Sequence, residues 1–424
     1  MPLQGPFVVV ADSPAPDVAQ ALRAAGGFPI VESSWTDGAA ALASVGPEGV
    51  VVAEPCSERT RGAALAKALA VRSQFGSDAP FMPVLARIRD DHAAPVADAL
   101  TISASAPAAR IPLRLASALR IRALHSTVLR RRAMLGSHGQ KLPELPSGDP
   151  LDDATVLVAG RGRSYPALSV AVGERVGLVG ALSVESAARA LNVRDINGMV
   201  IGDGFSPRIV EALLTVLAEQ ARFRDLPVAV LGCHPSVVEP FAKRLANLDR
   251  VAEGPARLLE RFLPFVRLNA FGERLKRMLK SLDARGMIDP DTGLLAHDAF
   301  WRDLNRAVDE AEKRGVGLSI ARFSFDGTSR RSSLDAARVV GRLMRQVDFA
   351  CREADNSIFA VFTETDLRAA HVVARRIASA LKNTMLAPDR KRAGIDATVT
   401  LATLKPTDSV DSLIARVVQE SSAG

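Results

Sequence analysis

The chain is 424 residues long and 48% hydrophobic, which allows two to four packed domains of ordinary size. Its three cysteines are far apart and odd in number, which argues against both a disulfide framework and a cysteine metal site. The formal charge of +7 leaves a phosphate-rich partner open, whether nucleotide or nucleic acid.

The first segment alternates short apolar runs with alanine-rich helical stretches. The runs lie at residues 7–10, 49–53, 83–86 and 99–102. Uninterrupted Val, Leu and Ile runs of this kind predict parallel strands that are buried on both faces. With room for five strand–helix units, the segment predicts a flavodoxin-like, doubly wound domain.

A second segment repeats the same pattern. Its apolar runs lie at residues 155–158, 176–179, 198–201 and 227–231, with a weak run at 250–252. A stretch rich in Gly, Pro, Ser and Asp separates the two segments and predicts a linker. We therefore expect an α/β fold with a first domain at 1–135, a linker at 136–153, a second domain at 154–282 and a third at 283–424.

Each of the first two segments ends in a long predicted helix, at 113–134 and at 256–282. In the second helix, apolar residues recur at helical spacing and form one continuous face. Such a face pairs two copies of a chain in a homodimer or packs on the chain's own domain. The sequence leaves both arrangements open.

Arginines gather in and near the first long helix. Two interpretations remain open: a solvated basic face, which is the commoner arrangement, and a site for a phosphate-rich partner. Aromatic interleaving and zinc knuckles are missing, so we do not expect nucleic-acid binding. The arginines are Arg110, Arg114, Arg120, Arg122, Arg130, Arg131 and Arg132.

In their strand–helix order the first two segments resemble receiver domains of response regulators. A working receiver has an acidic pair for magnesium after strand one, a phosphoacceptor aspartate after strand three and a lysine after strand five. The first segment has Asp12 after strand one, but its acceptor position falls at Ala53 or Glu54. No lysine lies after its fifth strand, between Leu100 and Pro112. In the second segment Asp203 stands at the acceptor position without an acidic pair or lysine.

Without two or more carboxylates, magnesium has few ligands and the phosphoryl charge is not screened. We therefore expect two degenerate receivers that serve structure or bind partners. Asp203 is the one possible phosphoacceptor, although such a residue is more often a turn or cap residue. A regulatory role for Asp203 or Glu54 stays open.

A turn motif opens the third segment, where the chain reads D-P-D-T-G-L-L-A-H-D-A-F. It resembles the opening turn of GGDEF domains, D-x-L-T-G-L-x-N-R-x-x-F. The resemblance covers residues 282–419 and implies an α/β domain with a mostly antiparallel central sheet. The final helix motif of the family, A-L-Y-x-A-K, is missing from this sequence. The matching residues are Asp289, Thr292, Gly293, Leu294 and Phe300.

The signature hairpin of the family, R-x-G-G-D-E-F, reads R-E-A-D-N-S-I from Arg352 to Ile358. In GGDEF cyclases, carboxylates in this hairpin and at the end of an earlier strand hold the catalytic metal. Here Ser357 and Ser324 stand at those places, and only Asp326 remains. Since one carboxylate is a poor magnesium site, we expect no enzyme activity, no catalytic residue, no metal and no cofactor.

One constellation of the family is kept. The inhibitory product site of GGDEF domains uses R-x-x-D before the hairpin and an arginine on the following helix, and the resemblance assigns these roles to Arg345, Asp348 and Arg376. An arginine fork suits guanine O6 and N7, and a carboxylate suits guanine N1 and N2. The alternative is that Arg345 and Asp348 form only a solvated ion pair on a helix surface and bind no ligand. The register with the other motifs favours a cyclic di-GMP site.

The order receiver, receiver, GGDEF resembles PopA-type cyclic di-GMP effectors. It implies a non-catalytic receptor in signalling or cell-cycle control that recruits partner proteins, such as polar or proteolytic adaptors. With no stretch of roughly 18 uncharged apolar residues, we expect a cytoplasmic protein without a membrane span. The resemblance to these effectors also implies recruitment to a cell pole. Two alternatives remain: a ligand-independent scaffold and a weak diguanylate cyclase. Sequence alone does not name the partner, the trigger or the oligomeric state.

Overall fold

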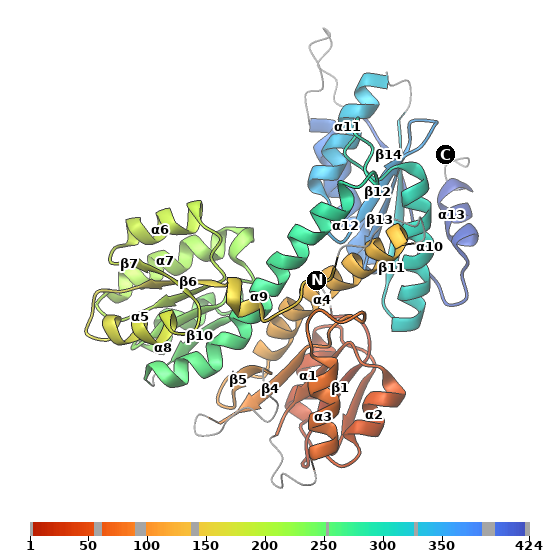
Figure 1. The fold of residues 1–424 in the computed structure, drawn as a ribbon. Coiled ribbons are helices and arrows are strands. Elements are labelled where there is room, and N and C mark those ends of the chain that lie inside the picture. The colour runs from red at the N-terminus through yellow and green to blue at the C-terminus, as the bar shows by residue number, and fades with distance from the viewer. Residues whose placement is uncertain are drawn as a thin grey trace.

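The computed structural model describes residues 3–54, 62–89, 99–136, 144–251, 254–325, 330–383 and 395–419. Within them the chain forms three α/β units, two with parallel sheets and one with an antiparallel sheet. Figure 1 shows these units around two long helices, α4 (Arg110–Gly136) and α9 (Pro255–Asp283), which meet near the centre of the molecule.

The first unit is a five-stranded parallel sheet in the order β2-β1-β3-β4-β5, as in flavodoxin-like folds. The apolar runs predicted four of its strands and missed β2, whose sequence Ile-Val-Glu-Ser is only partly buried at the sheet edge. Helices α1 (Pro16–Ala24), α2 (Gly38–Val45) and α3 (Ala63–Arg72) accompany the sheet. The strands are β1 (Phe7–Val10), β2 (Ile30–Ser33), β3 (Gly49–Val52), β4 (Val84–Ile88) and β5 (Leu100–Ser103).

The second unit has the same topology, with its strands in the order β7-β6-β8-β9-β10. The expectation of two doubly wound parallel sheets is therefore confirmed. The strands are β6 (Thr155–Ala159), β7 (Gly177–Ala181), β8 (Gly198–Ile201), β9 (Val228–Leu231) and β10 (Leu248–Val251). The helices are η1 (Pro150–Asp153), α5 (Tyr165–Gly173), α6 (Val184–Val193), α7 (Pro207–Glu219), η2 (Ala221–Phe223), α8 (Pro235–Val238) and η3 (Glu239–Phe241).

The third unit has a four-stranded sheet in the order β12-β13-β11-β14, and every pair in it is antiparallel. This confirms the expected mostly antiparallel sheet. A terminal helix is present although its family motif is missing. The strands are β11 (Leu318–Ser324), β12 (Phe349–Arg352), β13 (Ile358–Thr363) and β14 (Thr398–Thr403), and the helices are α10 (His297–Arg314), α11 (Arg330–Leu343), α12 (Leu367–Asn383) and α13 (Val410–Gln419).

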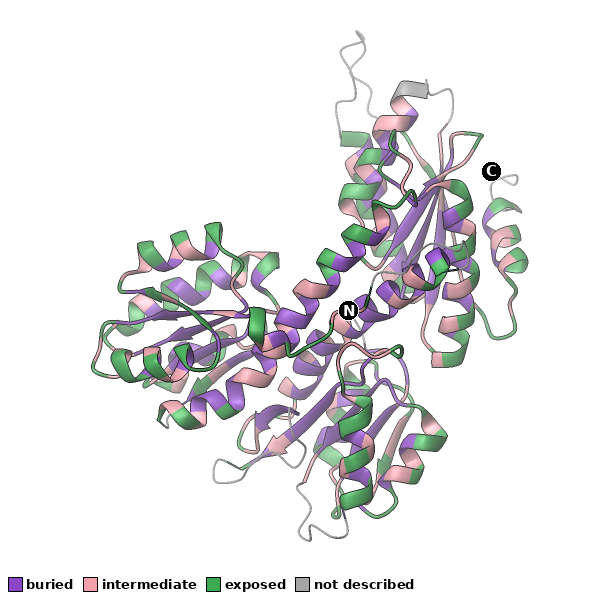
Figure 2. Ribbon diagram, in the orientation of Figure 1, coloured by how far each residue is buried: buried purple, intermediate pink, exposed green. Residues whose placement is uncertain are grey.

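Helices α4 and α9 pack against each other and join the first unit to the third. One continuous apolar cluster runs from the sheet of the first unit through both helices into the third unit. Phe271 of α9 illustrates the joint, since its ring stacks on Phe75 and meets the edges of Phe81 and His125. The apolar face predicted for 256–282 is therefore covered largely within the chain, as the burial in Figure 2 shows.

A solvated basic face, one of the two interpretations left open for the arginines of the first long helix, is wrong for most of them. Arg114, Arg122, Arg130 and Arg131 are buried. Because burying an unpaired charge is costly, each of them faces a carboxylate of another element. Arg114 pairs with Asp249 of β10 at 3.3 Å, and the other three pair with Glu48, Asp303, Glu310 and Asp283. These arginines thus join the units and are not available to a nucleic acid.

A buried ionic cluster links the first unit to the third. The carboxylate of Glu48, before β3, accepts from Arg122 of α4 at 2.8 Å and from Arg314 of α10 at 2.8 Å. Arg314 also donates to Glu364 at 2.7 Å. Burial raises the pKa of Glu48, but the hydrogen bonds and charges of Arg314 and Arg122 outweigh it and lower the pKa to about 2.

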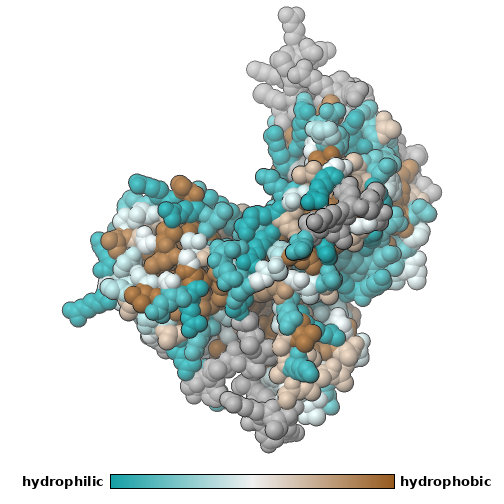
Figure 3. All heavy atoms as spheres, viewed as in Figure 1, coloured by the Kyte–Doolittle hydropathy of each residue, from teal (hydrophilic) through white to brown (hydrophobic). Residues whose placement is uncertain are grey.

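The surface is hydrophilic along α9, and apolar side chains gather on the second unit (Figure 3). Exposed large apolar residues of that unit include Val170, Leu178, Leu182 and Val193. None of the described helices has both the length and the apolar character that crossing a membrane requires.

Candidate functional site

The turn at Asp289 positions the third unit on the end of α9. Its carboxylate accepts from the Thr292 hydroxyl at 2.7 Å and from the Asp291 amide at 3.1 Å. Gly293 has a φ of 73°, a left-handed conformation that favours glycine. Leu295 then donates its amide to the Ala350 carbonyl at 2.9 Å, so the end of this turn is held against β12.

Arg345 and Asp348 form a bidentate ion pair between α11 and β12. The Arg345 Nε lies 2.8 Å from Asp348 Oδ2, and its Nη2 lies 2.7 Å from Asp348 Oδ1. The same Nη2 donates to the Thr363 carbonyl and the Thr365 hydroxyl, both at 2.8 Å. In turn the Thr363 amide donates to Asp348 Oδ1 at 3.1 Å. The predicted pair is therefore present and fully engaged in hydrogen bonds.

The two partners differ in their exposure to solvent. The Asp348 side chain is 1% exposed, whereas the Arg345 side chain is 35% exposed. Burial lowers the pKa of Arg345, but the hydrogen bond and charge of Asp348 outweigh it and raise that pKa. Arg345 thus carries a permanent positive charge to the surface, and Asp348 holds its guanidinium from behind.

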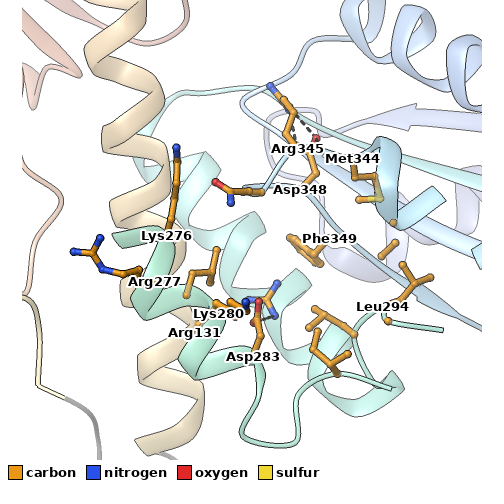
Figure 4. A pocket seen from close by; sticks show the side chains of 17 residues that line it. Arg131, Lys276, Arg277, Lys280, Asp283, Leu294, Met344, Arg345, Asp348 and Phe349 are labelled. Atoms are coloured by element: carbon orange, nitrogen blue, oxygen red, sulfur yellow. Dashed lines mark hydrogen bonds and ion pairs between the residues drawn. The ribbon is translucent and has the colours of Figure 1, made fainter. Parts of the chain in front are cut away.

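Arg345 and Asp348 line a cavity of about 460 Å³. Its size falls within the range of small-molecule sites in proteins. Figure 4 shows Arg345, Met344 and Asp348 of the third unit on one side of this cavity and residues of α9 on the other. Gly293 and Leu294 of the opening turn also line the cavity.

Arg376 lies outside this lining. It is an exposed residue of α12, and its Nη2 donates to the Leu343 carbonyl at 3.1 Å. That carbonyl ends α11, two residues before Arg345. The structure therefore brings Arg345 and Asp348 together in one cavity and places Arg376 on the adjoining helix end, engaged elsewhere.

The signature hairpin is stabilised by hydrogen bonds between its own residues, Ser357 and Asp355. Ser357 donates its hydroxyl to Asp355 at 2.6 Å and its amide to the same carboxylate at 2.9 Å. Arg322 of β11 donates to Asp355 at 2.7 Å, which places a cation against the hairpin. Burial raises the pKa of Asp355, but the hydrogen bonds from Ser357 and Arg322 outweigh it and lower that pKa.

Ser324 ends β11 close to this hairpin, and Asp326 lies outside the described residues. Arg322, two residues before Ser324 on the same strand, makes a second hydrogen bond to this hairpin, from its Nε to the Ser357 hydroxyl at 3.3 Å. In the described part of the chain no group of three or more His, Cys, Asp or Glu residues could hold a metal ion.

Asp203 holds the start of α5. The Ser164 hydroxyl and amide both donate to its carboxylate, the amide at 3.2 Å from Oδ1 and 3.4 Å from Oδ2. Its backbone carbonyl accepts from the Gly162 amide at 3.0 Å. In the first unit Glu54 Oε2 accepts from the Ser13 amide at 3.2 Å. Both residues thus have a structural task in their loops.

Sequence reasoning missed the basic residues of α9 that line the cavity: Lys276, Arg277 and Lys280. Their signal was the spacing of Lys276 and Lys280, since residues four apart share one face of a helix. The apolar face of the same helix masked that signal. Only the packing of the third unit against α9 assigns these residues to the cavity.

No protein-family model matches the chain, and no curated protein does. Among solved structures the chain is similar to the coiled coil and GGDEF domain of DgcB from Caulobacter crescentus in complex with c-di-GMP: 23% identity, 36% of this chain and 86% of that chain covered, TM-score 0.31. It is also similar to diguanylate cyclase SiaD in complex with its activator SiaC from Pseudomonas aeruginosa, at 15% identity, 51% and 96% coverage and a TM-score of 0.31. The FimX GGDEF domain from the same organism has 15% identity, 32% and 92% coverage and a TM-score of 0.30. At these identities the similarity concerns the fold alone.

Proposed function

We propose that the chain is a non-catalytic receptor for cyclic di-GMP, with two degenerate receiver domains followed by a degenerate GGDEF domain. The observation that carries the proposal is the pair Arg345 and Asp348 at the wall of a cavity of small-molecule size. The register of the pair with the Asp289 turn and with the hairpin supports the same role.

The chemistry of the pair fits a guanine base. A guanidinium fork matches O6 and N7 in two parallel hydrogen bonds. In the unliganded pair Arg345 already donates to Asp348 and to the turn at Thr363, so ligand binding exchanges these bonds for bonds to the base. Asp348 accepts from guanine N1 and N2 once Arg345 moves aside.

Absence of catalysis is part of the proposal. It is supported by Ser324 and Ser357 at positions where the GGDEF family has metal carboxylates. It is also supported by Arg322, whose guanidinium pairs with Asp355 and bonds Ser357 in the hairpin, because a cation there disfavours a bound metal ion. A bound nucleotide then acts as a signal, and the surfaces of the receiver units are free to recruit partner proteins, at a cell pole or elsewhere in the cytoplasm.

A titration of the full chain with cyclic di-GMP tests the proposal. We expect micromolar or tighter binding to the wild type. Arg345→Lys keeps the charge beside Asp348 but loses the fork, so it should weaken binding about ten- to a hundredfold. Arg375→Lys is the matched control, because Arg375 is exposed on α12 and makes none of these contacts.

Cyclic di-AMP provides a second control, because adenine carries a donor where guanine O6 accepts. Equal affinity for both ligands would contradict guanine recognition by Arg345. If the wild type binds neither ligand at micromolar concentration, the receptor proposal fails. A ligand-independent scaffold then takes its place, a role that the exposed apolar residues of the second unit favour.

A further inference from the structure

The cavity at Arg345 has a second wall that belongs to α9. Lys276, Arg277 and Lys280 line it from this helix, and Arg131 of α4 reaches it from behind. Lys276 and Lys280 are one helical turn apart and share a face. In Figure 4 both lie across the cavity from Arg345, while the guanidinium of Arg277 extends away from it.

The cavity carries a surplus of positive charge. Its lining has five basic side chains and two acidic ones. Both acids are already paired within the lining, Asp283 with Arg131 at 3.4 Å and Asp348 with Arg345 at 2.7 Å. The three basic side chains that have no acidic partner within the lining are those of α9: Lys276, Arg277 and Lys280.

The lysines of α9 are held weakly by their own surroundings. Lys276 pairs with Glu273 at 2.7 Å, an exposed pair within one helix that contributes little. The side-chain ammonium of Lys280 makes no hydrogen bond or ion pair with the residues that the structure describes. Both ammonium groups are therefore available to a ligand without the loss of a strong contact.

We propose that Lys276 and Lys280 bind the phosphodiester groups of the ligand whose guanine base contacts Arg345, so that the site is shared between the third unit and α9. This inference rests on the proposed function. A lysine ammonium is a point charge that suits a phosphate oxygen without the geometry of a fork. Cyclic di-GMP carries two phosphodiesters, and its charge of about −2 complements the surplus on α9.

Calorimetric titration of the full chain with cyclic di-GMP tests the inference. Lys280→Gln should weaken binding about fivefold, and Lys276→Gln with Lys280→Gln about twentyfold or more. Lys243→Gln is the matched control, since Lys243 is an exposed lysine of the second unit that lies outside the cavity lining. It should bind as the wild type does.

The salt dependence of the affinity for cyclic di-GMP distinguishes a lost charge contact from a defect in folding. Wild-type affinity should fall between about 0.05 and 0.5 M salt, because screening weakens the attraction of the lysines for phosphate. The double variant should show a flatter dependence. Thermal melting should be unchanged in each lysine variant, because both side chains are exposed.

The outcomes separate the two proposals. If the wild type binds and the double variant matches Lys243→Gln in affinity and salt dependence, the role of α9 is overturned while the receptor proposal stands. If the wild type does not bind, the receptor proposal fails and this inference fails with it. Weaker binding with a flatter salt dependence in the double variant, while Lys243→Gln binds as the wild type does, supports the shared site.

Discussion

Single side chains at the cavity have distinct tasks. Asp348 is buried, and in the unliganded chain it holds the Arg345 guanidinium through two parallel bonds. Removing Asp348 would leave a partly buried cation and the Thr363 amide without their acceptor. Loss of one partner of a fully buried pair costs about 3–5 kcal/mol, and the 35% exposure of Arg345 lowers that cost here. Binding tests are therefore cleaner at Arg345, where a lysine keeps the pair charged.

Arg376 tests how far the family site extends in this chain. Its guanidinium donates to the Leu343 carbonyl and must leave that carbonyl to reach a ligand. We expect Arg376→Ala to weaken cyclic di-GMP binding by about three- to tenfold, less than Arg345→Lys does. Titration beside Arg375→Ala measures the difference. Equal affinities of the two alanine variants would remove Arg376 from the site.

Asp203 should not accept a phosphoryl group. Its carboxylate is engaged by the Ser164 hydroxyl and amide, and no acidic partner for magnesium is provided by the loop after β6. We expect an unchanged intact mass after treatment with acetyl phosphate and magnesium, beside a competent receiver as a positive control. A phosphoryl adduct that maps to Asp203 would overturn this expectation.

Secondary-structure elements connect the cavity to the rest of the molecule. The turn after β13 is contacted from two sides: Arg345 donates to the Thr363 carbonyl, and Arg314 of α10 donates to Glu364. Arg314 also pairs with Glu48 of the first unit. The same short turn thus adjoins the candidate site and the junction between units, and Glu364 holds a φ of 49° there.

The Glu48 junction predicts an acid-sensitive structure. Its pKa is lowered from 4.5 to about 2 in the folded chain, so its contribution is complete above pH 4.5 and is lost as the pH falls toward 2. That contribution is on the order of 3 kcal/mol. Glu48→Gln should lower the unfolding midpoint at pH 7 and flatten its dependence on pH below 4.5.

Thermal melts at several pH values measure this effect. Glu32→Gln is the control, because Glu32 is an exposed glutamate of β2 in the same unit. Wild type and Glu32→Gln should lose stability together in acid. An acid profile of Glu48→Gln that coincides with theirs would show that the junction does not depend on this carboxylate.

At the scale of the whole molecule, we expect no synthesis of cyclic di-GMP. Two GTP molecules cyclise only where carboxylates hold divalent metal near both the phosphates and the attacking hydroxyl. Ser324 and Ser357 lack such carboxylates. Incubation of the full chain with GTP and magnesium, followed by chromatography, should yield no product. Steady turnover that disappears in Asp326→Ala would establish a cyclase instead.

The packing of α4 against α9 limits which surfaces a homodimer of this chain can use. The apolar faces of α4 and α9 cover each other, and an apolar cluster continues from them into the third unit. A homodimer built on those faces would have to open this packing. Any homodimer should therefore use another surface, and the exposed apolar residues of the second unit are the candidates.

Local sequence patterns determined many of the strands of this protein and one ion pair of the candidate site. Strands β1, β3, β6 and β8 were predictable because buried parallel strands are short uninterrupted apolar runs. The Arg345 and Asp348 pair was predictable because both residues lie within one turn of the chain, in register with the hairpin. Edge strand β2 was missed because a half-buried strand loses that apolar signature.

Only the tertiary structure decided the roles that depend on distant partners. The arginines of α4 looked solvent-facing because a helix is read from its own residues, yet Asp249, Asp303 and Glu48 reach them from other elements. The lysines of α9 join the cavity only because the Asp289 turn folds the third unit against this helix. Long-range charge pairing has no fixed spacing along the chain, and sequence patterns therefore do not contain it.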